Sequence, residues 1–495
     1  MMKKNYILCL IVGFLSGFGF APYSCILLLF LTYSLFFYAF MKARNKRQMF
    51  LCGFCFGFGI GAMSMSWLVH ALLIDNGAFA WLVPVVPLGF GLLFGLFFGL
   101  PALLCWRVNH IFARVLAFAG WLCIFEWIRS WLFTGFPWNL TGSVWTAWLP
   151  VLQTASVTGV YGLSLFSIIW FAVPFLIYKK QYVWAAIDLS TFAFIAIFGF
   201  LRCYEMTHEY VWGVQLRLVQ PNIEQTLKWD DNAAEENFMQ HIRLSKSKNH
   251  EKITHVLWSE TASPYPLDVS EDARAMTISA VRQNGTLITG SLRVADKSKK
   301  QLANSVFVLN DMGEIESFYD KSHLVPFGEY VPLRNILPFD KIVPIGSDIK
   351  EGSGVKTIRI PNAPPAGMLV CYEVIFPHQV VDRTQPRPKW LINVTNDGWY
   401  GDSAGPYQHL ASAQMRAVEE GLPLVRVAGT GISAIIYPWG EIMSSLPLNT
   451  QGVLDGSLPK ALDSITIYAR LGNSIPLILS LLCIVFALIL NKKSP

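Results

Sequence analysis

The amino-acid sequence predicts a bundle of about eight membrane-spanning helices joined to a layered α/β domain. Of its 495 residues, 53% are hydrophobic and 15% are charged, whereas a soluble globular protein carries about 25% charged residues. The apolar surplus lies mainly in the first 205 residues, and beyond them short β-branched runs alternate with amphipathic stretches. We therefore expect an N-terminal bundle of about seven helices (1–205), a polar domain (206–470) and a C-terminal helix with a short tail (471–495).

The predicted spans are apolar runs long enough to cross a hydrocarbon core of about 30 Å. The first run follows Lys3 and Lys4, as the apolar part of a signal peptide would, but it has no A-x-A cleavage site and its glycines favour helix packing. We therefore count it as a span. The eight runs lie near residues 5–20, 23–41, 49–72, 80–105, 111–133, 155–177, 183–203 and 471–490.

Basic residues determine the orientation that we expect, because they concentrate on the cytoplasmic side of a membrane protein. With the N-terminus inside, the basic connections at 42–47, 107–114, 179–180 and 492–493 are all cytoplasmic. Both termini are then cytoplasmic, and the polar domain lies outside the cytoplasm. Residues 1–205 carry a net charge of +8 and the rest −2, so the polar domain has no basic excess for a nucleic acid.

One helix of the predicted bundle carries two opposite charges. Glu126 and Arg129 stand three residues apart on one helix face, in or near the membrane, where unpaired charges are costly. Two interpretations stay open at this point. The two side chains form an internal ion pair that stabilises the bundle, or they act near a lipid headgroup.

The polar domain contains one of the nine cysteines, Cys371, so it cannot form an internal disulfide. A lone thiol is either a small buried hydrophobe or a nucleophile. Cys371 ends the apolar strand 367–371 and is followed at once by Tyr372, Glu373 and a predicted turn. A nucleophile at a strand end is held rigidly, and the backbone amides beyond it can face a developing oxyanion. This context favours the nucleophile.

A nucleophilic thiol needs a base and a nearby positive charge. His323, His378 or His409 would give a cysteine–histidine pair, although the sequence around them carries no signature of one. The other candidate base is Glu260, at the end of a predicted strand, with Lys321 as the candidate cation.

Three motifs in this chain order resemble the Glu-Lys-Cys triad of the nitrilase superfamily. They are Trp258-Ser-Glu260, Tyr319-Asp-Lys321 and Val370-Cys371-Tyr-Glu373. The resemblance implies an αββα sandwich in which Glu260 is the general base, Lys321 stabilises the tetrahedral oxyanion and Cys371 forms a thioester. Further motifs at 126–139, 159–162, 220–229 and 396–402 resemble the apolipoprotein N-acyltransferase family, the membrane-bound branch of this superfamily.

That resemblance implies an enzyme of the inner membrane of Gram-negative bacteria, with its catalytic domain in the periplasm. The implied acyl donor is the sn-1 chain of a membrane phospholipid, with phosphatidylethanolamine as the expected one. The implied acceptor is the α-amino group of the S-diacylglyceryl-cysteine at the N-terminus of a lipoprotein, in the last step of lipoprotein maturation. The mechanism requires no metal or cofactor, because the thioester keeps the acyl group activated. The alternative is a membrane-anchored amidase of the nitrilase type.

Further residues take expected roles from the same resemblance. Glu329 would orient Lys321 or tune its proton, and Trp229, Tyr372 and Glu373 would surround the pocket. Aromatic loops, with Trp399-Tyr400 and the segment 325–345, would shield the thioester from water and dip into the bilayer interface. The chain departs from the family at Gly429, where members often have asparagine.

Overall fold

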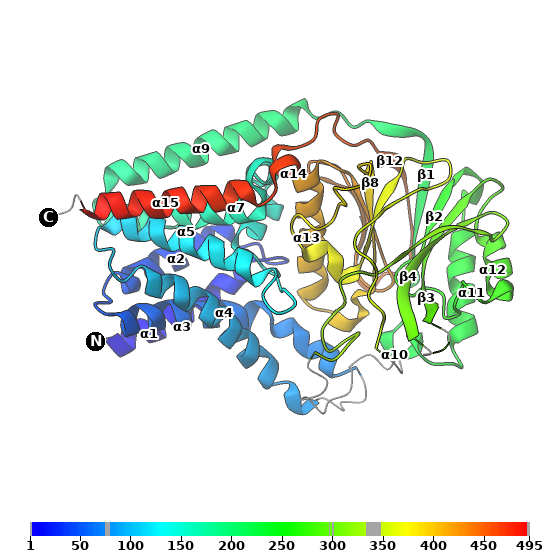
Figure 1. Ribbon diagram of the computed structural model, residues 1–495, viewed down its shortest axis with the longest axis horizontal. Coiled ribbons are helices and arrows are strands. Elements are labelled where there is room, and N and C mark those ends of the chain that lie inside the picture. The colour runs from blue at the N-terminus through cyan, green and yellow to red at the C-terminus, as the bar shows by residue number, and fades with distance from the viewer. Residues whose placement is uncertain (1, 75–79, 297, 299–300, 333–347, 493–495) are drawn as a thin grey trace.

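The computed structural model describes residues 2–74, 80–296, 298, 301–332 and 348–492. A helical part and a part built on two β-sheets lie side by side (Figure 1). Both ends of the chain lie at the end of the helical part that faces away from the sheets (Figure 1). The helices of the helical part are α1 (Met2–Ser16), α2 (Ile26–Phe40), α3 (Lys46–Ser64), α4 (Val85–Leu104), α5 (Ile111–Arg129), α6 (Leu149–Leu152), α7 (Ala155–Phe171), α8 (Val173–Tyr178), α9 (Tyr182–Glu205) and α15 (Ser474–Lys492), with the 3₁₀ helices η1 (Gly17–Gly19), η2 (Ser66–Leu72), η3 (Ala80–Leu82) and η4 (Thr141–Ala147).

Fewer helices than expected are long and apolar enough to cross a membrane. Within the described ranges there are five, or six when α3 and η2, bent by 46° at their junction, are taken as one span. The expected number of eight is therefore too high by this measure. Helices α1 and α2 have 15 residues each, which at 1.5 Å per residue extend about 22 Å and fall short of a 30 Å core.

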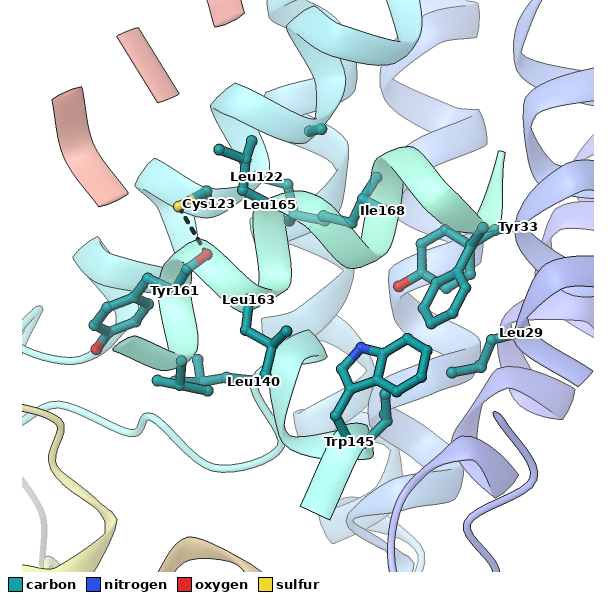
Figure 2. Packing of buried hydrophobic residues seen from close by; sticks show 14 of the residues in the cluster. Leu29, Tyr33, Leu122, Cys123, Leu140, Trp145, Tyr161, Leu163, Leu165 and Ile168 are labelled. Carbon is teal, nitrogen blue, oxygen red and sulfur yellow. Dashed lines mark hydrogen bonds between the residues drawn. The ribbon is translucent and has the colours of Figure 1, made fainter. Parts of the chain in front are cut away.

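Small residues and large aromatic side chains alternate in the packing of the bundle. A Cβ atom on Gly53, Gly57 or Gly61 of α3 would lie 2.4–2.5 Å from a backbone carbonyl oxygen of α4, so these helices approach closely. Figure 2 shows how Tyr33 of α2, Trp145 of η4 and neighbouring leucines fill the space between the helices. The bundle is therefore a packed core rather than a loose set of spans.

The sheet part is a sandwich with helices on both outer faces, which confirms the expected αββα architecture. Its first sheet has the strand order β12-β1-β2-β3-β4-β5 and its second β11-β10-β9-β8-β7-β6. Helices α11 (Ala234–Ser245) and α12 (Glu271–Thr277) cover the first sheet, and α13 (Gly405–Glu420) lies between the second sheet and the helical part (Figure 1). The strands are β1 (Tyr210–Gln220), β2 (His255–Leu257), β3 (Thr286–Asp296), β4 (Gln301–Asn310), β5 (Ile315–Asp320), β6 (Thr357–Ile358), β7 (Ala366–Val370), β8 (Trp390–Thr395), β9 (Leu424–Ala428), β10 (Ser433–Ile436), β11 (Ile442–Leu446) and β12 (Gly452–Pro459).

Candidate active site

Cys371 stands at a sharp turn between strand β7 and the 3₁₀ helix η7 (Cys371–Ile375). Its φ of +52° lies in the left-handed region, which a residue with a side chain adopts only at some cost. Glu373 secures the turn, because its Oε2 accepts a hydrogen bond of 2.7 Å from the Val370 amide. The thiol therefore has a fixed position at the end of a buried strand.

A buried lysine lies between two carboxylates beside this turn. Lys321 Nζ is 2.9 Å from Glu329 Oε2 and 3.5 Å from Glu260 Oε1. Lys321 follows directly on β5, and Glu260 follows β2 by three residues. The ends of separate strands thus bring together residues that are far apart in the sequence.

Asparagines hold the two carboxylates in place. Asn304 Nδ2 of β4 donates to Glu260 Oε1 at 2.8 Å and to Glu329 Oε1 at 3.0 Å. The backbone amide of Asn396 donates to Glu260 Oε2 at 2.9 Å, so both oxygens of Glu260 have a donor. The sequence interpretation missed Asn304, whose one signal is a polar side chain inside an apolar strand run.

A second lysine that the sequence interpretation missed lies behind Glu260. Lys228 is at the end of the short helix α10 (Gln225–Lys228), and its Nζ donates to the Glu260 carbonyl at 2.8 Å. Burial lowers the pKa of Lys228 to about 8, although Glu260 opposes this shift. Lys228 lies within the motif 220–229, but the sequence does not show this contact, because Lys228 precedes Glu260 by more than thirty residues.

The charges of the site affect the thiol and the lysine in opposite ways. Burial, followed by the Glu260 carboxylate, raises the pKa of Cys371 to about 12. Burial disfavours the charged form of Lys321, but Glu329 and Glu260 outweigh it and raise the pKa of Lys321. The resting site therefore holds a neutral thiol and an ammonium group beside Glu260 and Glu329.

These groups line a cavity of about 200 Å³ between the sandwich and the helical part. Most of its wall is apolar, and Leu68 and Ala71 of η2 close one side of it, which the sequence did not predict. Of the expected shielding segment 325–345, Val325, Pro326 and Gly328 line the cavity, and residues 333–345 lie outside the described residues. The other lining residues are Trp229, Glu260, Thr261, Asn304, Lys321, Glu329, Cys371, Asn396, Trp399 and Tyr400.

Comparison with known proteins gives consistent matches along the chain. Residues 12–173 match the family model of the apolipoprotein N-acyltransferase N-terminal domain, and residues 215–464 match that of carbon-nitrogen hydrolase. The chain is 35% identical over 520 residues to an apolipoprotein N-acyltransferase of Rhodopseudomonas palustris, covering 99% of this chain and 96% of the relative. The chain belongs to the apolipoprotein N-acyltransferase family. Membership makes it an acyltransferase of the nitrilase superfamily and a bacterial membrane protein.

Other relatives match in the same way. The apolipoprotein N-acyltransferase of Rickettsia prowazekii is 36% identical over 500 residues, covering 99% of this chain and 98% of the relative. Among solved structures, an amidase from Nesterenkonia sp. is 18% identical, with a TM-score of 0.37, covering 50% of this chain and 92% of that chain.

Two residues that resemble family positions around the pocket do not line the cavity. The Tyr372 hydroxyl donates to the Gly135 carbonyl at 2.8 Å and so contacts the helical part. Glu373 Oε1 accepts hydrogen bonds from Tyr319, Ser322 and His323, next to Lys321. Their contacts indicate support of the site from behind rather than contact with a substrate.

The histidines considered as alternative bases bind other groups. His409 Nε2 is 3.1 Å from the Cys371 carbonyl and its Nδ1 is 2.9 Å from Asp397 Oδ1, so it contacts the backbone of the nucleophile. His323 is hydrogen-bonded to the Thr134 carbonyl, and His378 is hydrogen-bonded to the Arg383 side chain. None of these three histidines lines the cavity, whereas Glu260 does.

Glu126 and Arg129 lie in α5, away from the cavity. Glu126 Oε1 accepts from the Thr141 amide at 2.8 Å and from its hydroxyl at 2.7 Å. Arg129 Nη1 donates to the carbonyls of Phe136 and Trp138 at 3.0 and 2.8 Å. Both residues are described, and they form no ion pair within 4 Å, so each binds the segment after α5 instead.

The departure from the family at Gly429 has a local structural basis. A Cβ atom on Gly429 would lie 2.9 Å from Ser259 Oγ, one residue before Glu260. An asparagine here would require the Ser259 side chain to move. The Asn396 side chain of the site is also near, with its Oδ1 4.0 Å from the same Cβ position.

Proposed function

We propose that this protein transfers the sn-1 acyl chain of a phospholipid, phosphatidylethanolamine in the first instance, to the N-terminus of diacylglyceryl-modified lipoproteins. One observation carries this proposal: Glu260, Lys321 and Cys371 line an apolar cavity whose wall includes membrane-helix residues. Such a cavity suits an acyl chain that stays in the bilayer, because exposing it to water would cost about 0.8 kcal/mol per CH₂ group.

In the first half-reaction, Glu260 takes the proton of the Cys371 thiol, and the thiolate attacks the ester carbonyl carbon. A general base is needed here because a thiol with a pKa of about 12 is protonated at neutral pH. Lys321 and a backbone amide beyond Cys371 hold the oxyanion. The bond between the carbonyl carbon and the glycerol oxygen then breaks, and the proton on Glu260 passes to that oxygen. The products are an acyl thioester and a lysophospholipid.

In the second half-reaction, the neutral α-amine of the lipoprotein attacks the thioester carbonyl. Lys321 again stabilises the oxyanion, and the carbon–sulfur bond breaks to leave an amide. Glu260 takes the proton lost by the amine and returns it to the thiolate. The site is thereby restored without a metal, nucleotide or cofactor.

We further infer that the sandwich faces the periplasm. With α3 and η2 as one span, five spans lie between the basic connection 42–47 and β1. An odd number of spans places that connection and the sandwich on opposite sides of the membrane. This holds whether α1 and α2 both cross the membrane or both turn back within it. The basic connection belongs on the cytoplasmic side, which supports a periplasmic sandwich and cytoplasmic termini.

The test is intact-mass spectrometry of the purified full-length protein after incubation with phosphatidylethanolamine, with Cys371→Ala as the matched control. We expect a mass increase of one acyl chain on the wild type alone, removed by hydroxylamine, together with released lysophospholipid. Addition of a diacylglyceryl-cysteine peptide should then discharge the adduct as an N-acyl peptide. An unmodified wild-type protein, with hydrolysis of a small amide instead, would support the amidase alternative.

A further inference from the structure

Gln408 in α13 lies at the contact between the sandwich and the helical part, where it is 5% exposed. Its amide makes hydrogen bonds to three separate segments of the helical part. Its Oε1 accepts from Trp67 Nε1 (2.9 Å), Trp138 Nε1 (2.8 Å) and Asn139 Nδ2 (3.1 Å), and its Nε2 donates to the carbonyls of Ala21 (3.2 Å) and Ser64 (3.3 Å).

These partners leave one orientation for the amide. All neighbours of Oε1 are N–H donors and both neighbours of Nε2 are carbonyl acceptors, so a flipped amide would face donors with donors. Both polar atoms of the glutamine side chain therefore have suitable hydrogen-bond partners at this position. Apolar side chains of the same length would remove all five hydrogen bonds from these buried groups. The Ser64 carbonyl would keep only its 3.5 Å contact with Asn139 Nδ2.

The network reaches the catalytic cavity through η2. Trp67 belongs to η2, and Leu68 and Ala71 of the same 3₁₀ helix line the cavity beside Cys371. The Trp67 ring meets the ring of Tyr400, another lining residue, edge to face with centroids 4.6 Å apart. A displacement of Trp67 would therefore move a wall of the cavity.

The bend between α3 and η2 is held by the same side chain. Ser64 is the last residue of α3, and its carbonyl is one that a helix end leaves without an internal partner. Gln408 Nε2 donates to this carbonyl, while Oε1 binds Trp67 just beyond the 46° bend. Gly405, one turn earlier in α13, permits the contact, since a Cβ there would lie 2.7 Å from the Trp67 ring.

We propose that Gln408 is a positioning residue that fixes η2 as a wall of the catalytic cavity, and that this wall is required for acyl transfer from membrane phospholipids. The inference rests on the proposed function, in which Cys371 is the nucleophile. The inference assigns the reactivity of Cys371 and the placement of the lipid to different parts of the molecule. The chemistry of Cys371 depends on residues of the sandwich, whereas the productive placement of a phospholipid acyl chain depends on Gln408 and η2.

The experiment compares two reactions of Cys371 in full-length Gln408→Met. The first is acyl-enzyme formation from phosphatidylethanolamine, followed by intact mass, and the second is alkylation of Cys371 by iodoacetamide, followed by peptide mass. We expect acyl-enzyme formation to slow at least tenfold and alkylation to change less than about threefold. Gln414→Met is the matched control, because Gln414 lies in the same helix and donates to the Gly440 carbonyl within the sandwich.

Trp67→Phe provides a milder variant in case Gln408→Met does not fold. It keeps an aromatic ring and removes one N–H donor to Gln408, so we expect a smaller slowing of the lipid reaction, again without a change in alkylation. Equal slowing of both reactions, or a lipid reaction within twofold of wild type in both variants, would overturn this inference. The proposed function would not be affected by either result. A wild-type protein that forms no acyl adduct would overturn the proposed function and this inference with it.

Discussion

Buried charges have different partners in the two parts of the molecule. In the sandwich, Lys321 contacts Glu329 at 2.9 Å and Glu260 at 3.5 Å, and all three side chains line the cavity. In the helical part, Glu126 and Arg129 bind a hydroxyl, an amide and two carbonyls of the segment after α5. The first group is a charge cluster that lines a cavity, and the second group consists of two side chains that bind a neighbouring segment of the chain.

The difference shows that helical spacing alone does not determine which charges pair. Three residues apart on α5, Glu126 and Arg129 have the spacing of an ion pair. The segment after α5, from residue 130 to Thr141 at the start of η4, however, presents backbone groups that need partners, and the two side chains bind some of these groups. Charged side chains at a reactive site, in contrast, need one side exposed to the cavity. Contacts with oppositely charged side chains keep them ionised there.

The largest effect that tests this comparison is expected at Lys321. Lys321→Met removes the cation expected to stabilise the oxyanion, and loss of such a group costs about 10²–10³ in rate. We therefore expect acyl-enzyme formation, measured by intact mass, to slow by about that factor. Lys350→Met, at an exposed position whose backbone amide donates to the Leu302 carbonyl of β4, should leave the rate unchanged. A rate within about threefold of wild type in Lys321→Met would remove Lys321 from the chemistry.

A smaller loss is expected at Glu329. Glu329→Gln keeps an oxygen near Lys321 but removes a negative charge that raises the pKa of the lysine. A hydrogen bond to a charged group contributes about 1.5–3 kcal/mol, of which the amide retains a part, so we expect about a tenfold slower acyl transfer. The alkaline limit of activity should also move to lower pH, because Lys321 then loses its proton more easily. Unchanged acyl transfer in Glu329→Gln would show that the assigned role is wrong; Glu351→Gln is the matched surface control.

The sequence predicts the sandwich better than it predicts the membrane-facing side of the cavity. Strands β7 to β9 follow from apolar runs, and Cys371 was predicted at the end of one of them. Asn304 and the η2 residues lie close to the site only after the chain has folded, and nothing in their local sequence indicates it. Lys228 lies in the motif 220–229, but its contact with Glu260 also forms only in the folded chain. The number of spans was overestimated because hydropathy does not show how long each helix is. The apolar runs near 5–20 and 23–41 form helices of only 15 residues each.

The pH dependence of Cys371 alkylation tests how the cluster acts on the thiol. Glu260 raises the pKa of Cys371 and Lys321 lowers it. Glu260→Gln should therefore shift the alkylation profile to lower pH, and Lys321→Met should shift it to higher pH, although both variants lose acyl transfer. Rates with iodoacetamide between pH 7 and 10 measure these shifts. A wild-type rate that is already maximal at pH 7 would instead indicate a resting thiolate and a different charge arrangement.

The smallest effect on acyl transfer is expected at Glu126, in the helical part. Glu126→Gln keeps an oxygen for the two hydrogen bonds from Thr141 and replaces Oε2, which has no hydrogen-bond partner. We expect acyl-enzyme formation within about twofold of wild type and little change in melting temperature. Arg129→Met, in contrast, leaves two carbonyls without their donor and should lower the free energy of unfolding by about 1–3 kcal/mol. If Glu126→Gln slowed acyl transfer as much as Glu329→Gln does, Glu126 would belong to the reaction and the contrast between the two parts would fail.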